Sequence, residues 1–154
     1  MKKIKGPNKE TVASKNYIYL DLPTSMDDCF YDLKLKTVKL TENEDKYVAV
    51  FEVLDTDTKV RKGAEISHMM DPYQKFAETY FWRDIFTLYC VTRGKEASEE
   101  NIKPLVDKSD KILEKVTSED FKGVGGACTC RITSYTNKED QRKTRREWSP
   151  LDAE

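Results

Sequence analysis

The sequence predicts a mainly β domain of the α+β class: a five-stranded antiparallel Greek-key barrel with a long amphipathic helix between its third and fourth strands. Segments of alternating apolar and polar residues occur between residues 29 and 70 and return after residue 123. Between these regions, apolar residues recur at the spacing of one helical face. The chain has 154 residues, of which 38% are hydrophobic, enough for one core without disulfides.

Residues 1–16 contain almost nothing that a core could bury, and we expect them to form a mobile arm. A single domain is expected over residues 17–150, followed by a short acidic end at residues 151–154. The first clear strand is predicted from Cys29 to Leu40, because apolar and charged side chains alternate along it.

The second strand is predicted at Tyr47–Leu54, which is apolar on both faces and therefore suits a central position. A third strand is predicted from about Lys62 to Met70, where apolar residues alternate with polar ones. Polar or charged loops at residues 41–46 and 55–61 connect these three strands. The three strands together are therefore expected to form an antiparallel meander.

The long helix is predicted from Tyr73 to Thr92. Asp71 is placed to cap its first turn, Pro72 suits the first helical position, and Gly94 supplies the stop. Trp82 lies off the apolar face and is expected at a rim or an interface. Four aromatic residues on that face are expected in the core: Tyr73, Phe76, Tyr80 and Phe81.

A second helical pattern covers roughly residues 98–116. Ser98 is a suitable N-cap, but Pro104 leaves a later start at Ile102 open, because proline disrupts a helix interior.

The chain is expected to end in a hairpin. A fourth strand is predicted from Gly123 to Tyr135, with glycines that mark a bulge or a tight bend. A charged tip is expected over residues 137–146, followed by a short last strand that includes Glu147 and Trp148.

Three strands, a helix and two further strands follow one another in the order of an OB-fold, a small barrel that binds oligonucleotides. Beyond this order, five segments carry a resemblance to a known family: Asp21-Leu22-Pro23, Phe51-Glu52-Val53-Leu54, Lys62-Gly63, Leu88 to Gly94, and Phe121-Lys122-Gly123. Over residues 20–150 the chain resembles the phage-encoded single-stranded DNA-binding and recombination-associated OB-fold proteins. The resemblance implies a non-enzymatic protein, without cofactor, that coats single strands during phage replication or recombination in the host cytoplasm. Replication proteins are possible further partners.

Basic and aromatic side chains occur where such a protein would hold a strand. Single strands are bound by cations that contact phosphates and by aromatic rings that stack on bases. The last hairpin has the densest group, and the first strand and the loop before the third strand add further cations. The candidate nucleic-acid-binding residues are Lys34, Lys36, Lys59, Arg61, Lys62, Arg131, Tyr135, Arg142, Lys143, Arg145, Arg146 and Trp148.

The composition argues against several other classes. The net charge of −1 gives no global basic field, so any nucleic-acid surface must be local. No apolar run approaches about 18 residues, so we expect no membrane partner. No hydrophobic segment follows the basic start of the chain, so we expect no secretory signal and four reduced cysteines in the cytoplasm.

The sequence gives little support to the hypothesis of an enzyme. His68 is the only histidine, which limits any nucleophilic machinery to that side chain. Asp55, Asp57 and Lys59 fit the acidic end of a magnesium-dependent nuclease motif, but they fall in a loop. Cys128 and Cys130 lack the second pair of ligands that a zinc site needs.

Two functional alternatives therefore remain beside single-strand binding. A protein-interaction module that acts on a replication or host factor is the first alternative, and a metal-dependent nuclease is the second. The choice between DNA and RNA, the oligomeric state and any role of the acidic end stay open.

Overall fold

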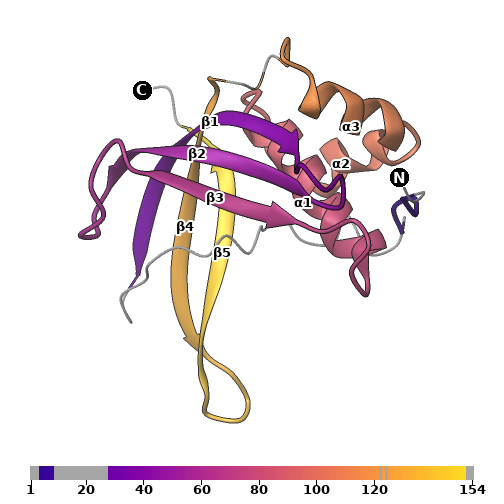
Figure 1. Cartoon of the computed structure of the whole chain (residues 1–154). Coiled ribbons are helices and arrows are strands. Elements are labelled where there is room, and N and C mark those ends of the chain that lie inside the picture. Colours follow the sequence, from indigo (N-terminus) through magenta and orange to yellow (C-terminus); the bar gives the residue numbers. More distant parts are fainter. Residues whose placement is uncertain (1–3, 9–27, 122, 124, 152–154) are drawn as a thin grey trace.

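The computed structural model describes residues 4–8, 28–121, 123 and 125–151. Five antiparallel strands form one curled half-barrel sheet, and three helices cover one side of it (Figure 1). The strands lie in the order β3-β2-β1-β4-β5, so β4 returns beside β1 after the helices. The elements are β1 (Cys29–Leu40), β2 (Tyr47–Thr56), β3 (Glu65–Met70), α1 (Ala77–Val91), α2 (Glu99–Val106), α3 (Ser109–Thr117), β4 (Ala127–Thr136) and β5 (Arg142–Pro150).

The long strand β1 bends the sheet. Its first half, Cys29–Lys34, pairs with β4, whereas β2 follows it from Tyr31 to Leu40. The register of β1 against β2 shifts between Asp32 and Leu33 and again between Leu35 and Thr37, and such bulges increase local twist. No ladder joins β3 to β5 within the described part of the chain, so the sheet is open there.

The predicted alternation in β1 is confirmed. Tyr31, Leu33 and Leu35 are fully buried, while the residues between them face outward. The prediction that β2 is buried on both faces is only half right. Tyr47, Ala49, Phe51 and Val53 are buried, but the residues that alternate with them are half-exposed, because the helices cover one face of the sheet only.

Helix α1 is shorter than predicted. Phe76 has a φ of 63°, in the left-handed region, and therefore ends the preceding turns, so the helix begins at Ala77. The Oδ1 atom of Asp71 accepts a hydrogen bond from the Tyr73 N–H at 2.9 Å, so this carboxylate caps a turn rather than the helix. Because the helix begins only at Ala77, Pro72 also lies outside it.

The late start of α1 changes which aromatic rings are buried. Phe81 is in the core as predicted, but the exposed fraction is 55% for Phe76 and 45% for Tyr80. Trp82 is 1% exposed, and its ring packs against Phe81 and Phe86 with centroid distances of 5.2 and 5.6 Å. The prediction of a rim position for Trp82 is therefore wrong.

The end of α1 follows the predicted glycine signal. Gly94 has a φ of 78°, its N–H donates to the Val91 carbonyl, and the Lys95 N–H donates to the Cys90 carbonyl. This pair of bonds is the Schellman arrangement, for which glycine is favoured because it lacks a Cβ.

The second helical region is divided in two, with a break at Asp107 and Lys108. Ser98 is the N-cap of α2 and accepts from the Asn101 N–H, as the sequence suggested. Pro104 lies within α2.

Part of the predicted arm lies against α1. The indole Nε1 of Trp82 donates to the Lys5 carbonyl at 2.7 Å, and the Asn8 N–H donates to the Glu78 carbonyl at 2.9 Å. Ile4 packs against the core. The rest of the predicted arm, residues 17–27 and the final three residues fall outside the described residues.

The final hairpin is longer than predicted. Strand β5 begins at Arg142, so the turn covers only residues 137–141. The glycines lie before β4, and a Cβ on Gly126 would collide with the Thr92 carbonyl oxygen. Glycine is therefore required where the chain passes the end of α1 and enters β4.

Candidate nucleic-acid interface

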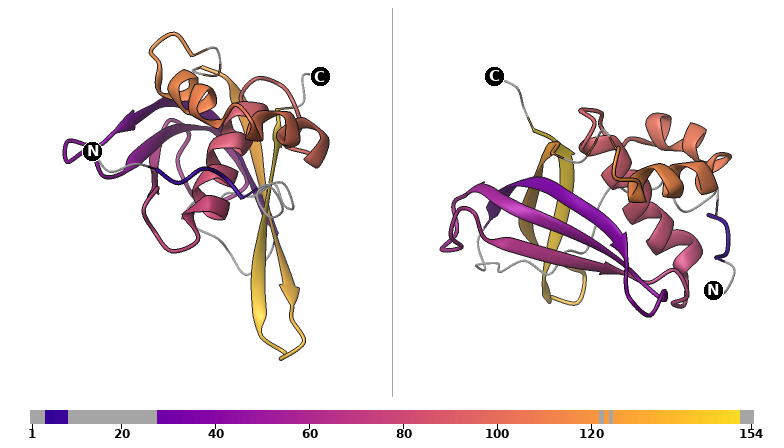
Figure 2. Two further views of the ribbon diagram at one scale, coloured as in Figure 1. Left: turned by 90° about the vertical axis from the view of Figure 1, so that its right-hand side faces the viewer. Right: turned by 45° about the horizontal axis from the view of Figure 1, so that its top comes forward.

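The hairpin of β4 and β5 projects from the body as a two-stranded ribbon (Figures 1 and 2). The β4–β5 pairs continue to Thr136 and Arg142, whereas β1 pairs with β4 only as far as Ile132. Among the described residues, no third strand pairs with the outer part of this hairpin. We call Thr133–Thr136 with Arg142–Arg146 the basic ribbon.

Asn137 fixes the turn at the end of the basic ribbon. Its Oδ1 atom accepts from the N–H groups of Glu139 and Gln141, both at 2.9 Å. Asp140 takes a φ of 58°, a conformation that aspartate tolerates better than most residues. The turn is thereby defined by its own side chains, which keeps the two strands in register.

The two strands of the basic ribbon contain four cations and no acidic residue. The direct β4–β5 pairs place their side chains on two faces. Thr133, Tyr135, Lys143 and Arg145 share the outer face of the sheet, and Ser134, Thr136, Arg142, Thr144 and Arg146 share the inner face.

Tyr135 and Arg145 form the most distinctive contact on the outer face. The guanidinium of Arg145 lies 5.1 Å from the ring centroid of Tyr135, within the range of a cation–π interaction. The Tyr135 side chain nevertheless stays 43% exposed. An exposed aromatic ring beside a positioned cation combines the two features that bind single strands.

The outer face continues from the ribbon onto the body. Arg131 is exposed and pairs directly with the half-buried Phe30 of β1 on one side and Glu147 of β5 on the other. Arg131 is four residues from Tyr135, a separation of about 13 Å along a strand. Asp32 follows Phe30 on this face and accepts from the Thr129 hydroxyl, so the positive surface ends there.

The predicted contribution of Lys34 and Lys36 is weakened by nearby acids. The Nζ atom of Lys36 lies 2.9 Å from Glu65 and 3.8 Å from Glu52, and the hydrogen bond with Glu65 raises the pKa of the Lys36 ammonium. Lys34 pairs directly with Glu52 across the sheet. These lysines therefore add little net charge to the outer face.

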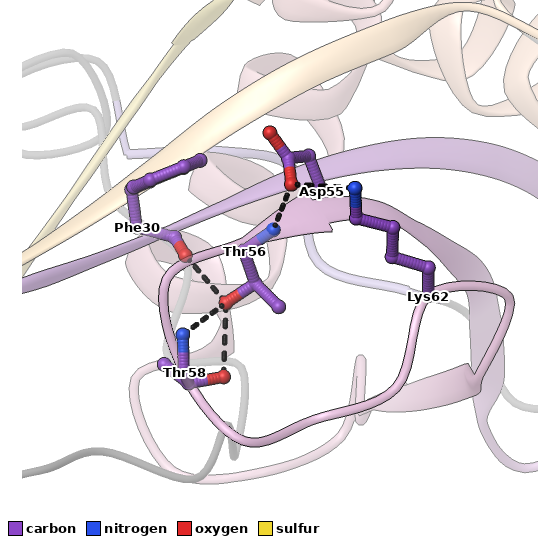
Figure 3. A network of polar contacts seen from close by, with 5 residues as sticks. All are labelled: Phe30, Asp55, Thr56, Thr58 and Lys62. Atoms are coloured by element: carbon purple, nitrogen blue, oxygen red, sulfur yellow. Dashed lines mark hydrogen bonds and ion pairs between the residues drawn. The ribbon is translucent and has the colours of Figure 1, made fainter.

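The loop between β2 and β3 holds Lys59, Arg61 and Lys62, all exposed. Its start is fixed to β1 by the network in Figure 3, in which the Thr56 hydroxyl donates to the Phe30 carbonyl at 2.8 Å. The Nζ atom of Lys62 lies 3.3 Å from Asp55, which neutralises part of that cation. Lys59 and Arg61 remain the exposed cations of this loop.

The acidic residues of the same loop have structural partners. Asp57 accepts from the Phe30 N–H at 3.0 Å, and Asp55 accepts from the Thr56 N–H at 2.9 Å. Among the described residues, no group of three His, Cys, Asp or Glu side chains is placed to hold a metal ion. The two carboxylates therefore have a structural role, in which they fix the loop through hydrogen bonds from backbone N–H groups.

Trp148 does not belong to the exposed surface. It is 1% exposed and packs against Phe51, with ring centroids 5.7 Å apart. The expectation that this ring stacks on a base is corrected, because β5 extends far enough for its alternation to turn residue 148 inward. Residues two apart on a strand lie on the same face, so Trp148 shares the face of Arg146 and not that of the residues between and beside them. This alternation is visible in the sequence and could have shown that Trp148 points inward.

The cysteines lie in the same core. All four are buried thiols that form no disulfide, on β1, α1 and β4. Burial raises the pKa of the Cys90 thiol to about 11 and that of the Cys130 thiol to about 12. Burial raises the pKa of Cys128 as well. Because the thiolate is the reactive form, these groups are protected in the folded protein.

Comparison with known proteins gives no relative: no family model, curated protein or solved structure matches the chain. The helices in the described part of the chain are all too short or too polar to cross a bilayer.

Proposed function

We propose that the protein binds single-stranded nucleic acid, with DNA as the first candidate, on the outer face of β1, β4 and β5. The strand order and the helices between β3 and β4 support an OB-like Greek-key fold, a partly open barrel that commonly holds oligonucleotides. A role in coating single strands during phage replication or recombination, without enzymatic activity, is part of the same proposal and rests on the sequence resemblance.

The contact between Tyr135 and Arg145 carries this proposal. It places an exposed ring and a cation on a projecting ribbon whose strands contain no acidic residue. In the proposed complex Tyr135 stacks on a base, and Lys143, Arg145 and Arg131 contact phosphates. The cations of the β2–β3 loop, Lys59 above all, extend the path beyond Phe30.

Substitutions at Tyr135 test the stacking role. We expect Tyr135→Ser to weaken binding of a fluorescein-labelled oligo(dT) strand by about 1–3 kcal/mol, because one stacked base contributes that much. Tyr135→Phe keeps the ring and should bind as wild type does. Fluorescence anisotropy titrations at four salt concentrations measure both affinities and their salt dependence.

Tyr80→Ser is the matched control, because Tyr80 is a tyrosine of almost equal exposure on α1, 45% against 43%. It should leave DNA affinity unchanged. Equal affinities for wild type and Tyr135→Ser would refute the stacking role, and an absence of any single-strand binding by wild type would refute the function itself.

One observation favours the protein-interaction alternative. Phe76 and Tyr80 are both exposed and pack edge to face, with centroids 6.5 Å apart. Phe76 also borders an open cavity of about 490 Å³ that Lys5 and Tyr73 help to line. A partner that binds this surface would be lost in Phe76→Ser, whereas DNA binding would be unaffected.

A further inference from the structure

We propose that a cavity between the ends of α1 and α3 binds a nucleoside monophosphate group. The cavity has a volume of about 340 Å³, within the range of small-molecule sites. It uses none of the residues assigned to the nucleic-acid interface, and α3 lies far from the tip of the basic ribbon (Figures 1 and 2). The residues that line the cavity are Tyr89, Arg93, Lys115, Ser118, Asp120 and Phe121.

Two cations of this lining are not neutralised by the part of the chain that the structure describes. Arg93 and Lys115 are both exposed, and neither forms an ion pair with a described carboxylate. By contrast, the Nζ atoms of three other lysines lie 2.9–3.3 Å from a carboxylate oxygen. Two such cations at one cavity favour a ligand with a phosphate monoester, which binds guanidinium and ammonium groups through charge-assisted hydrogen bonds.

The position of Arg93 is not explained by the end of the helix. Three carbonyls in the last turn of α1 already accept hydrogen bonds from the backbone N–H groups of residues 92–95. The guanidinium of Arg93 lies instead 4.4 Å from the centroid of the Tyr89 ring, in a cation–π contact. This contact fixes the guanidinium beside the cavity, where its N–H donors suit bidentate binding of a phosphate.

The aromatic part of the lining suits a base. The half-buried Tyr89 ring packs against Phe121 with centroids 6.0 Å apart and an angle of 25° between the ring planes. Bases stack both on aromatic rings and on guanidinium planes. The base of a bound nucleotide is therefore expected against Tyr89 and Arg93.

Asp120 distinguishes a nucleotide from a simple anion. Its carboxylate is exposed at the cavity and forms no ion pair with Arg93 or Lys115. An ionised carboxylate only accepts hydrogen bonds, so it repels a phosphate but accepts from the hydroxyl groups of a sugar. A nucleotide supplies both groups, and we expect its ribose at Asp120 and its phosphate at the two cations.

Isothermal titration calorimetry of the full chain tests the site with four probes: AMP, adenosine, ribose 5-phosphate and inorganic phosphate. AMP should bind about tenfold or more tightly than each of the others, because each of them lacks at least one of the three groups that the cavity recognises.

The nucleoside monophosphate could be a free nucleotide or the end of an RNA strand, and two RNA hexamers distinguish these sources. Displacement of AMP only by the hexamer with a 5′-phosphate supports the proposal and identifies a strand end. Displacement by neither that hexamer nor its 5′-hydroxyl counterpart supports the proposal and identifies a free nucleotide.

Two variants assign the parts of the ligand. Lys115→Gln should weaken AMP binding roughly tenfold, the usual effect of losing a hydrogen bond to a charged group. Wild type should prefer AMP to 2′,3′-dideoxy-AMP, whereas Asp120→Ala should bind the two equally. Lys111→Gln is the matched control, because it removes the same charge from an exposed position one turn earlier on α3 and should bind AMP as wild type does. Thermal melting checks that all three variants are folded.

Three outcomes would overturn the inference. AMP that binds no more tightly than adenosine excludes a phosphate contact. Equal losses in Lys115→Gln and Lys111→Gln show a general effect of charge and no site. Loss of AMP binding in Tyr135→Ser places AMP on the basic ribbon. Failure of the proposed function is a separate result, because Lys115→Gln should leave the affinity for oligo(dT) unchanged.

Discussion

The side of the sheet on which a residue lies decides whether we assign it to the proposed interface or to the core. Tyr135 and Trp148 are both aromatic residues in the last hairpin, and sequence proximity to arginines made both candidates for base stacking. Tyr135 lies on the outer face and Trp148 on the inner face, against Phe51. One therefore belongs to the proposed interface, and the other belongs to the core.

This difference gives a stability prediction. Trp148→Ala should lower the free energy of unfolding by about 3–5 kcal/mol, the usual cost of removing a buried tryptophan. Tyr135→Ala should lower it by about 1 kcal/mol or less, because this exposed side chain loses little beyond its cation–π contact with Arg145. Urea denaturation of the two variants beside wild type measures both values. Similar losses in the two variants would contradict the assignment.

Among the elements, β3 and α1 are joined by a polar contact. The Nε2 atom of His68 on β3 lies 2.8 Å from the Oδ2 atom of Asp84 on α1, and both side chains are largely buried. Burial raises the pKa of the Asp84 carboxyl, and His68 and then Arg83 oppose part of that effect. The carboxyl is thus more readily protonated in the folded protein than in the unfolded chain.

The raised pKa of Asp84 makes stability depend on pH. Between the unfolded value of about 3.9 and the higher folded value, the folded state holds a proton that the unfolded state has lost. The contribution of Asp84 to the free energy of unfolding therefore falls as the pH rises through this window. Asp84→Asn cannot titrate, so its stability should decline less than that of wild type from about pH 4 upward.

Urea denaturation at half-unit pH steps measures this dependence. Asp110→Asn, on the exposed surface of α3, is the control and should follow the wild-type curve. If wild type and Asp84→Asn gave identical curves of unfolding free energy against pH, protonation of Asp84 would not contribute to stability.

At the scale of the whole molecule, the helices and the half-barrel share one core. Helix α1 contacts α2, α3 and β5, while α3 contacts β1. The ring of Tyr47 on β2 lies 5.7 Å from that of Phe81 on α1, and residues 4–8 bind the outside of this helix. The sheet and the helices should therefore unfold together.

The four cysteines report on that cooperativity. An aromatic disulfide reagent should react with none of them promptly in the folded protein, because the thiols are buried and burial raises the pKa of three of them. All four should become reactive at one denaturant concentration, which matches the midpoint seen by tryptophan fluorescence. A thiol that reacts early, Cys90 on α1 for example, would show that the helices separate from the sheet before it unfolds.

The sequence was enough to predict the number of strands and their order along the chain, the alternation in β1, the glycine that ends α1 and the cap at Ser98. These features depend on periodicities and caps that act within a few residues, so local chemistry suffices to predict them. The density of cations in the last hairpin is also a property of the sequence alone.

Which side chains of that hairpin share a face could not be predicted from the sequence, because it depends on how the strands pair. The start of β5 at Arg142 depends on pairing with β4 rather than on local preference, and a shift of one residue would exchange the two faces. The same holds for Trp82 and Phe76. The left-handed Phe76 lies before α1 and is exposed, and the buried face of α1 is wider than periodicity predicted, so that it includes Trp82. The division of the basic ribbon into two cationic faces follows from that pairing, because strand register is fixed by contacts between segments and not by either segment alone.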